Sequence, residues 1–374
     1  MDNIFEVKHK DENSLARVGK LILAHGIVDT PTFMPVGTNG TVKGIYHEKI
    51  EKIGYNLILA NTYHLYLRPT VEVLQHYGGL HNFSNWKGNI LTDSGGFQIF
   101  SLSKLRKIKD EGVMFQSHID GSKHMLTPEK VVDIQKIIGS DILMCLDVCT
   151  ASDTSYKKSV EAMNITHQWA QRSINHWKTL DNFDGKLFGI VQGNFFKDLR
   201  KESAQFINDL DFPGIAIGGL SVGEDEQTFK EYLEFTASYL RYDKVRYVMG
   251  IGSPDYILDA IENGIDLFDC VLATRAARNG SLFTDDGMIQ MKKAEHTFDK
   301  NPIVEGCSCT ACKDYSRGYL RHLFKANEML GGMLATEHNL TYLYDLVENA
   351  KKAILNNSFK EFKNSYLARF YGKE

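Results

Sequence analysis

The chain has 374 residues, of which 43% are hydrophobic and 24% charged, a balance typical of a globular protein that excludes a disordered chain. Its formal net charge of -4 provides no general attraction to nucleic acid, so binding to RNA would need a local basic patch. The first residues are polar and no apolar run approaches the roughly 18 residues that span a bilayer, so we expect a cytoplasmic protein without a membrane segment.

Amphipathic stretches alternate with short apolar runs from about residue 47 onward. Helices are predicted at 47–54, 127–141, 157–180, 196–212, 226–240 and 255–264, and strands at 56–64, 88–96, 142–149, 186–193, 214–224, 245–254 and 265–275. Alternating helices and buried strands indicate a parallel sheet, and this many units favour a closed (β/α)8 TIM barrel, an α/β fold, over a doubly wound sheet. Residues 19–36 predict a strand pair that covers one end of the barrel.

Polar residues and glycines stand where the predicted strands end. They are Asp93, Asp147, Gln192, Gly219, Met249 and Asp269. In a parallel barrel all of these ends meet at one face, where TIM-barrel enzymes carry their chemistry. An acid at such a position can also be an ordinary turn or cap residue. Three acids after three different strands favour an active site.

Beyond the last predicted unit, the sequence indicates a metal site. Residues 280–293 predict a hairpin around a DDG turn. Three of only six cysteines then crowd into the spacing C-x-C-x2-C, as Cys307, Cys309 and Cys312. Together with His338 they would complete a closed tetrahedral site for one structural Zn2+ per chain. His322 is an alternative fourth ligand, and three incidental thiols are the alternative to any metal.

A predicted helix from Lys313 to Glu337 would return the chain to the cysteines. Lys313, Arg317, Arg321 and Lys325 recur on it every four residues and would share one face. Such a stripe is either a solvated face or a surface that follows RNA phosphates. We expect one catalytic domain over 1–374, with a zinc-binding subdomain at about 290–345 and C-terminal helices at about 340–372.

Seven motifs in register resemble a known family. LTDSGGFQIFSL, FQSHIDGSKHMLTPE, LFGIVQG, IAIGGLSVGE, YVMGIG, LFDCVLATRAARNG and the cysteine motif with its histidine resemble the bacterial type of tRNA-guanine transglycosylase, or queuine tRNA-ribosyltransferase. The resemblance implies a pentosyltransferase of queuosine biosynthesis. Such an enzyme exchanges the wobble guanine of tRNAs with GUN anticodons for the 7-deazaguanine preQ1, through a covalent aspartyl-ribosyl intermediate. It also implies a homodimer.

The resemblance implies a role for each matching residue. Asp269 corresponds to the nucleophile and Asp93 to the general acid/base, which needs a raised pKa. The base pocket would comprise Ser94, Gly95, Gly96, Phe97, Asp147, Cys149, Gln192, Gly219, Leu220, Tyr247 and Met249. Phe97 or Tyr247, with Met249, would contact the faces of the base, although core packing is an equal alternative for Phe97 and Met249.

Two further segments would hold the RNA around a flipped wobble nucleotide. They comprise Gly250, Ile251, Gly252, Ser253, Pro254, Asp255 and Tyr256, and Thr274, Arg275, Ala276, Ala277 and Arg278. Cys149 and Val222 match the bacterial pattern and favour preQ1 or guanine over the larger base queuine. Val148 departs from that pattern, because most bacterial members have a glutamate there that is associated with switching between guanine and preQ1.

Two other functions stay open at this point. Paired carboxylates at strand ends also suit a glycoside hydrolase on the same barrel. A non-catalytic tRNA-binding paralogue is the second alternative, although Asp269, Asp93 and Asp147 are all present.

Overall fold

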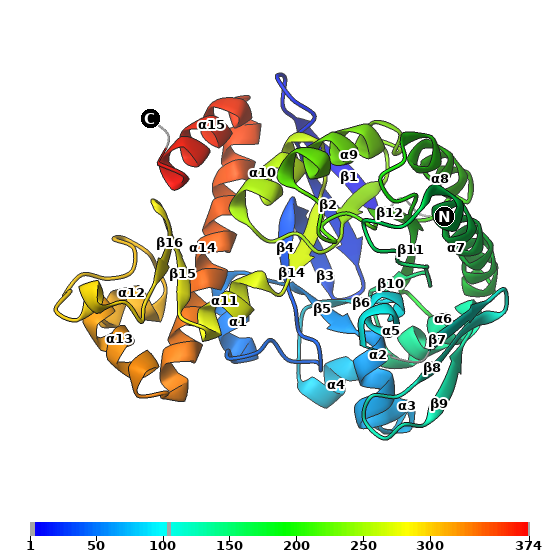
Figure 1. Ribbon diagram of the computed structural model, residues 1–374, viewed down its shortest axis with the longest axis horizontal. Helices are drawn as coiled ribbons and strands as arrows, with labels where there is room; N and C mark the ends of the chain where they lie inside the picture. Colours follow the sequence, from blue (N-terminus) through cyan, green and yellow to red (C-terminus); the bar gives the residue numbers. More distant parts are fainter. Residues whose placement is uncertain (1–3, 103–105, 373–374) are drawn as a thin grey trace.

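An eight-stranded parallel barrel forms the centre of the computed structural model, which describes residues 4–102 and 106–372 (Figure 1). The strand order is β4-β14-β13-β12-β11-β10-β6-β5. The ring closes because Val36, directly after β4, bridges in parallel to Leu59 of β5. The predicted TIM barrel is confirmed. Its strands are β4 (Thr32–Pro35), β5 (Leu57–Asn61), β6 (Asn89–Asp93), β10 (Ile142–Met144), β11 (Lys186–Val191), β12 (Gly214–Ile217), β13 (Val245–Val248) and β14 (Leu267–Cys270).

Helices surround the barrel because their apolar positions recur every three to four residues and pack against strands that are buried along almost their whole length. Capping side chains fix several helix starts, as where Thr127 Oγ1 accepts from Lys130 N at 3.2 Å. The helices are α1 (His47–Ile53), α2 (Thr62–Leu65), the π-turn Tyr66–Thr70, α3 (Val71–Tyr77), α4 (Leu80–Ser84), α5 (Gly96–Leu102), α6 (Pro128–Ile138), α7 (Tyr156–Trp177), α8 (Lys197–Asp209), α9 (Glu226–Ser238), α10 (Pro254–Glu262) and α11 (Leu272–Arg278).

An antiparallel sheet of β1 (Phe5–Lys10), β2 (Arg17–Leu23) and β3 (Gly26–Thr30) covers the N-terminal end of the barrel. Arg17 anchors it there, since its Nη2 lies 2.6 Å from Oδ2 of Asp266, directly before β14, and both side chains are fully buried. The predicted strand pair is therefore confirmed for β2 and β3. Its last part is wrong, because Thr32–Pro35 pairs with β14 as a barrel strand.

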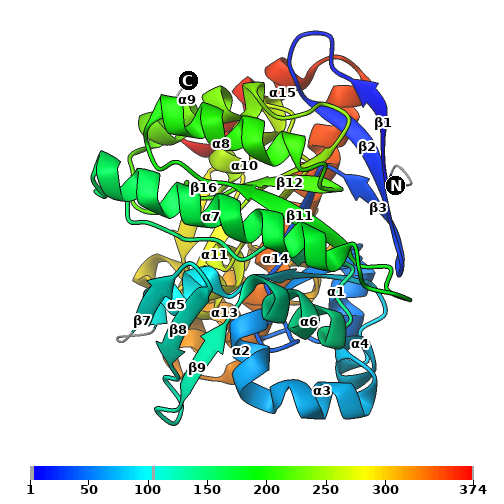
Figure 2. The same cartoon turned by 90° about the vertical axis from the view of Figure 1, so that its right-hand side faces the viewer.

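A second antiparallel sheet is inserted between α5 and α6. It comprises β7 (Arg106–Lys109), β8 (Gly112–Gln116) and β9 (Lys123–Leu126). In Figure 2 it lies on the opposite side of the barrel from β1–β3, hence on the side of the C-terminal strand ends. The sequence did not predict this sheet.

The C-terminal part forms a module beside the barrel, at the left of Figure 1. Its predicted hairpin is confirmed, but the single helix expected from Lys313 to Glu337 is wrong. The chain is extended at Tyr315, where Ser316 caps a new helix, and it breaks again before Met329. The elements are β15 (Ser281–Thr284), β16 (Gly287–Gln290), the 3-10 turn Ala294–His296, α12 (Thr310–Asp314), α13 (Arg317–Lys325), α14 (Met329–Leu355) and α15 (Phe359–Phe370).

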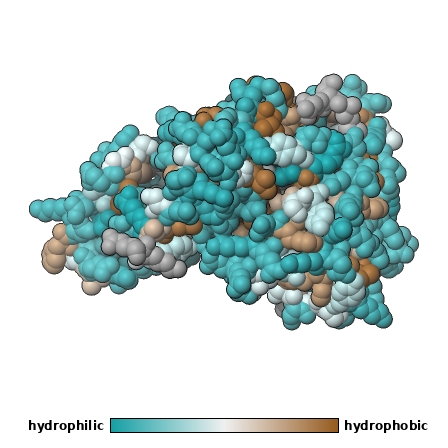
Figure 3. Space-filling model, turned by 90° about the horizontal axis from the view of Figure 1, so that it is seen from above, coloured by the Kyte–Doolittle hydropathy of each residue, from teal (hydrophilic) through white to brown (hydrophobic). Residues whose placement is uncertain are grey.

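The surface seen from above is mostly hydrophilic, with scattered apolar residues (Figure 3). Within 4–102 and 106–372, no helix has the length and apolar character needed to cross a bilayer.

Candidate active site and metal centre

Three acids from three strands meet at the C-terminal mouth of the barrel. Asp93 ends β6, Asp147 follows β10 and Asp269 is the penultimate residue of β14. The negative charges of Asp147 and Asp269 both raise the pKa of Asp93, so the three carboxyl groups lie close enough to interact. The parallel strand direction therefore brings together side chains that are up to 176 positions apart, as 269 minus 93.

Asp93 is held by neutral donors at the end of β5. Its Oδ1 accepts from Thr62 N and Gly95 N, each at 3.1 Å, and its other oxygen accepts from the Asn61 amide. Burial raises the pKa of Asp93 to about 7, and the negative charges of Asp269 and Asp147 act in the same direction. A carboxyl group with this pKa can hold and release a proton near neutral pH. Asn61 and Thr62 were missed from the sequence, although both stand at a predicted strand end.

Asp147 is buried, and polar side chains hold both of its oxygens. Its Oδ1 accepts from Ser94 Oγ at 3.1 Å, and its Oδ2 accepts from Gln192 Nε2 at 2.7 Å. The Cys149 thiol lies 3.5 Å from the same Oδ2. Burial raises the pKa of Asp147, and the bonds from Gln192 and Ser94 oppose that shift. A side chain at Gly96 would come within 2.9 Å of Asp147 Oδ1, so this glycine keeps the approach to the carboxylate open.

Asp269 has one oxygen fixed by two hydrogen bonds, and none of the described residues donates a hydrogen bond to the other oxygen. Its Oδ1 accepts from the Tyr247 hydroxyl at 2.5 Å and from Gly250 N at 3.0 Å. Burial raises the pKa of Asp269, and these two bonds counteract it. Tyr247 is fully buried and uses its hydroxyl to orient Asp269, so the expectation that it stacks on a base is wrong.

The remaining pocket residues divide into wall and rim. Gly219 has φ +68°, and a Cβ there would lie 2.6 Å from Gln192 Oε1, so the wall needs glycine. Leu220 is buried beside it and Met249 is half-buried. Phe97 on α5 is 50% exposed, so core packing is wrong for this residue.

Glu224 orients the backbone of this wall. It accepts from the amides of Ser221 and Val222, the latter at 2.8 Å. Ser221 has φ +58°, an unfavourable conformation for a residue with a side chain, and the carboxylate holds it there. Glu224 was also missed from the sequence, since one acid in an exposed loop has no distinctive pattern.

The segment after β13 is less available to RNA than expected. Ile251, Gly252, Pro254 and Asp255 are buried, because the chain turns inward to begin α10. Tyr256 stacks on Phe229 with ring centroids 4.1 Å apart. The buried residues cannot contact RNA, which leaves Gly250 exposed and Ser253 and Tyr256 partly exposed.

Helix α11 presents only part of its expected surface. Thr274 and Ala277 are buried, the latter in the core of the C-terminal module, so a side-chain contact with RNA is wrong for both. Arg275 and Arg278 are exposed, and Ala276 is half-buried between them. Their contact with RNA stays a prediction.

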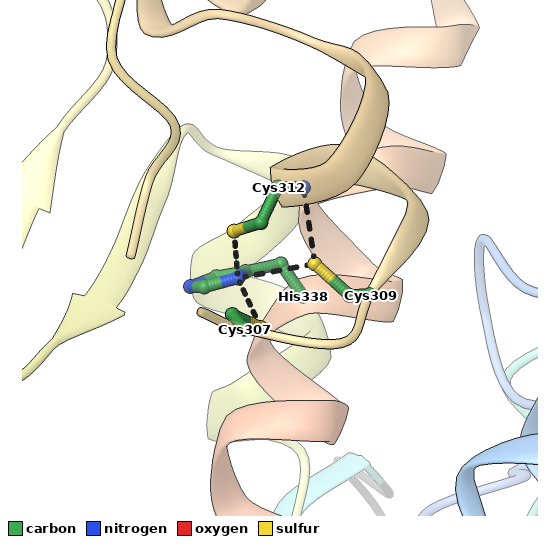
Figure 4. A group of neighbouring side chains, drawn as sticks. All are labelled: Cys307, Cys309, Cys312 and His338. Atoms are coloured by element: carbon green, nitrogen blue, oxygen red, sulfur yellow. Dashed lines mark hydrogen bonds between the residues drawn. The ribbon is translucent and has the colours of Figure 1, made fainter. Parts of the chain in front are cut away.

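Cys307, Cys309, Cys312 and His338 converge in the C-terminal module (Figure 4). The three sulfur atoms lie 3.8, 3.5 and 3.4 Å from His338 Nδ1. Ligands around a tetrahedral zinc ion are about 3.5 Å apart, from bonds of about 2.3 Å to sulfur and 2.0 Å to nitrogen. The cluster can therefore hold a metal ion of this size.

The hydrogen bond of the other ring nitrogen of His338 also indicates a metal site. Its Nε2 lies 2.8 Å from the Phe283 carbonyl and so carries the proton, which leaves Nδ1 free to bind a metal. His322 is exposed and lies outside the cluster, so of the two candidates only His338 is placed to be the fourth ligand.

The predicted basic stripe is not one surface. Lys313 lies on α12, whereas Arg317, Arg321 and Lys325 lie on α13. Arg317 Nη2 donates to the Ile303 carbonyl at 2.7 Å and Arg321 Nε to the Lys293 carbonyl at 2.8 Å, so both hold the module together. An RNA contact stays a prediction for Lys313 and Lys325, which are exposed.

A second group of possible ligands lies at the N-terminal end of the barrel. His25 Nδ1 is 2.7 Å from Asp141 Oδ1, and His81 Nε2 is 3.4 Å from Asp141 Oδ2. The two imidazoles stack with centroids 3.7 Å apart and planes 15° apart. Nearly parallel rings this close cannot both direct a nitrogen lone pair at one ion, so this group is a hydrogen-bonded stack.

Comparisons with known proteins give one consistent result. Residues 11–372 match the family model described as Queuine tRNA-ribosyltransferase. The chain is similar to the queuine tRNA-ribosyltransferases of Borrelia hermsii, at 54% identity covering 98% of both chains, and of Treponema denticola, at 52% identity covering 98% of this chain and 97% of the relative. That of Caldanaerobacter subterraneus is 50% identical over 98% of both.

We expect Cys309→Ser to lose its bound metal and to unfold at a lower temperature. Metal binding contributes folding energy, so the free energy of unfolding should fall by at least about 3 kcal/mol. In a protein of this size, that lowers the melting temperature by roughly 5 °C. Metal analysis and calorimetry measure both effects. Cys145→Ala, a buried cysteine far from the cluster in sequence, is the control and should keep its metal. Full metal content and unchanged melting of Cys309→Ser would contradict a structural metal site.

Proposed function

Because the chain belongs to the queuine tRNA-ribosyltransferase family, we propose that it replaces the wobble guanine of tRNAs with GUN anticodons by preQ1. The family carries out guanine transglycosylation on tRNA in the queuosine pathway. The observation that carries our proposal is the set of three acids at one mouth, Asp93 and Asp147 buried and Asp269 partly exposed, each held by a different group of donors. These donors distinguish the acids from each other and suit them to separate tasks.

Asp269 acts as the nucleophile. Its free Oδ2 forms a bond to C1′ of the wobble ribose while the bond from C1′ to N9 of guanine breaks and its electron pair moves to the base. Tyr247 and Gly250 fix the other oxygen, so the attacking lone pair is aimed without the entropic cost of a mobile side chain. The covalent intermediate preserves the energy of the glycosidic bond until the new base arrives.

Asp93 manages the proton. With a pKa of about 7 it donates a proton to the departing guanine and later accepts one from the incoming base. The incoming nitrogen then attacks C1′ and releases the Asp269 carboxylate. Transfer to a base instead of water distinguishes this reaction from that of a glycoside hydrolase.

Asp147 and Gln192 read the edge of the base. Guanine and preQ1 both present N–H donors beside a carbonyl oxygen. Asp147 accepts from Ser94 on Oδ1 and from Gln192 and the Cys149 thiol on Oδ2, and its remaining lone pairs can accept from the base. The half-exposed Phe97 can cover a face of the flipped base.

The backbone at Leu220 favours preQ1. Glu224 draws the N–H of Ser221 to itself, so the planar peptide directs the Leu220 carbonyl away from Glu224. A carbonyl in this wall can accept from the aminomethyl group of preQ1, which guanine lacks. In the opposite orientation of this peptide, the N–H of Ser221 would face the base and the Leu220 carbonyl would need another partner. The buried Val148, at the position where most bacterial members have glutamate, cannot stabilise that orientation.

The metal is proposed to be a structural zinc ion, since three thiolates and one imidazole close a tetrahedral shell. We also propose a homodimer that binds one tRNA through its two chains. Three large apolar side chains of the C-terminal module are exposed, Phe298 at 93%, Met329 at 85% and Tyr319 at 41%. A second copy of the chain would remove them from water.

We expect Asp269→Asn to bind tRNA but to lose base exchange by at least about a thousandfold, because an amide cannot form the covalent intermediate. Denaturing gels of enzyme mixed with tRNA should show a covalent adduct for the native chain and none for the variant. Asp209→Asn, an exposed acid at the end of α8, is the control. An adduct with Asp269→Asn would assign the nucleophile elsewhere. Hydrolysis of the glycosidic bond, with release of guanine but no incorporation of labelled guanine, would favour the hydrolase.

Removing Asp93 should change how stability depends on pH. The folded chain keeps the Asp93 proton up to about pH 7, whereas an unfolded aspartate loses it near pH 3.8, so this group lowers folding stability as the pH rises between these values. The free energy of unfolding of Asp93→Asn, relative to that of the native chain, should increase by roughly 2–4 kcal/mol from pH 4 to 7 and stay constant above that. Urea unfolding measures this gain, and a difference that does not vary with pH would refute the raised pKa. Exchange by the native chain should decline above pH 7.

Base exchange with guanine, preQ1 and queuine should rank preQ1 first, because only preQ1 both fits beside Val222 and satisfies the Leu220 carbonyl. We expect Val148→Glu to raise kcat/KM for guanine about tenfold, equivalent to about 1.4 kcal/mol, by providing a partner for the reversed peptide. Val148→Leu is the size control. Equal use of guanine and preQ1 by the native chain would contradict the fixed backbone.

A further inference from the structure

The inserted sheet β7–β9 lies beside the base pocket, yet no step described above uses it. It projects on the mouth side of the barrel, across from the C-terminal module that lies at the left of Figure 1. One cavity joins it to the pocket. Gly96, Asp147 and Cys149 line one part of this cavity, and Arg106 and Ile108 of β7 line another.

The face of β7 that points away from the cavity is basic. Side chains alternate along a strand, so Lys107 and Lys109 point opposite to Arg106 and Ile108. Lys107 and Lys109 are both exposed. Within the described residues, neither forms an ion pair with an acid. Two unpaired cations on one short strand contrast with the net charge of -4 of the whole chain.

Strand β7 is held firmly at both ends. At the turn that follows it, Trp169 Nε1 and Arg172 Nη1 of α7 donate to the Asp110 carbonyl at 2.9 and 2.8 Å. At its start, the Arg106 guanidinium lies 4.4 Å from the centre of the Phe100 ring. The acidic residues Asp110 and Glu111 directly follow Lys109 in the turn to β8, whereas the other end of β7, at Arg106, lies next to α5 and the mouth.

The same end of β7 continues into an aromatic surface. Phe97, half-exposed above the pocket, lies 6.5 Å from Phe100 between ring centroids, and Arg106 covers the next face. Aromatic rings with flanking cations suit single-stranded nucleic acid, because bases stack on the rings while the cations follow the phosphates.

We propose that β7 is an RNA-binding surface, whose Lys107 and Lys109 contact tRNA phosphates on the side of the mouth opposite the C-terminal module. This inference rests on the proposed function. A flipped nucleotide strains the backbone on both of its sides, so its RNA has to be held on both sides. Arg275 and Arg278 of α11 serve one side, and β7 serves the other.

Lysines on an edge strand also have a simpler use, which is to prevent pairing with the edge of another chain. That use requires no RNA. It predicts that neutral replacements cause self-association, whereas our proposal predicts weaker binding of tRNA by a chain that keeps its oligomeric state.

The test compares Lys107→Gln/Lys109→Gln with Lys20→Gln/Lys178→Gln, which removes two exposed lysines from β2 and from the end of α7, at the opposite end of the barrel. Binding of unmodified tRNA is measured from 50 to 300 mM salt, together with KM and kcat for exchange. We expect about tenfold weaker binding near 150 mM salt, a salt slope smaller by about 1 to 2, and unchanged kcat, since each phosphate contact contributes about 0.7 to 0.9 to the slope.

Three results would overturn the proposal. The β7 variant could match the control in affinity and slope, it could lose kcat at unchanged KM, or it could self-associate with normal affinity for tRNA. If the native chain itself neither binds tRNA nor exchanges guanine, the proposed function fails as well. Unchanged tRNA affinity, KM and kcat in both variants, with normal exchange by the native chain, would reject only the role of β7.

Discussion

The structure depends on keeping three carboxyl groups together at one mouth, two of them buried and Asp269 partly exposed, with no cation among the described residues to neutralise them. Within the described residues, Asp93, Asp147 and Asp269 form no ion pair, and neutral donors such as Asn61, Gln192 and Tyr247 stabilise them. Neutral donors lower the cost of burying a carboxylate less than an opposite charge does. The pKa of each acid therefore stays raised, and the protein retains groups that can carry protons and attack carbon.

Parallel strand direction explains why so much of this site could be predicted from the sequence. Asp93, Gln192 and Asp269 directly end buried apolar runs, and a parallel barrel leaves only one face for all such ends. Tyr247 could not be assigned in this way, because its position in the middle of a strand does not reveal that its hydroxyl reaches Asp269. Glu224 acts through the backbone of an exposed loop, where no periodic pattern exists.

The elements that were missed have physical reasons. Strand β7 is exposed at every position, so it lacks the alternation of apolar and polar residues by which strands are recognised. The segment from Lys313 to Glu337 has helical character throughout, but α12 and α13 meet at an extended residue close to the metal ligands. Tertiary contacts there override local preference, as they do for the inward-turned residues after β13.

Helix α14 couples the metal centre to the barrel. Its first part contributes Leu334 and Ala335 to the core of the C-terminal module, and its later part contributes Leu340 and Leu343 to the core of the barrel. His338 lies between them, so an ion bound there fixes the cysteine loop to the same helix that packs on the barrel. In the proposed complex, the buried acids repel the RNA backbone, and cations at the rim have to offset this repulsion. A rigid α14 keeps the cations of the module at a constant distance from those acids, which a flexible attachment could not do.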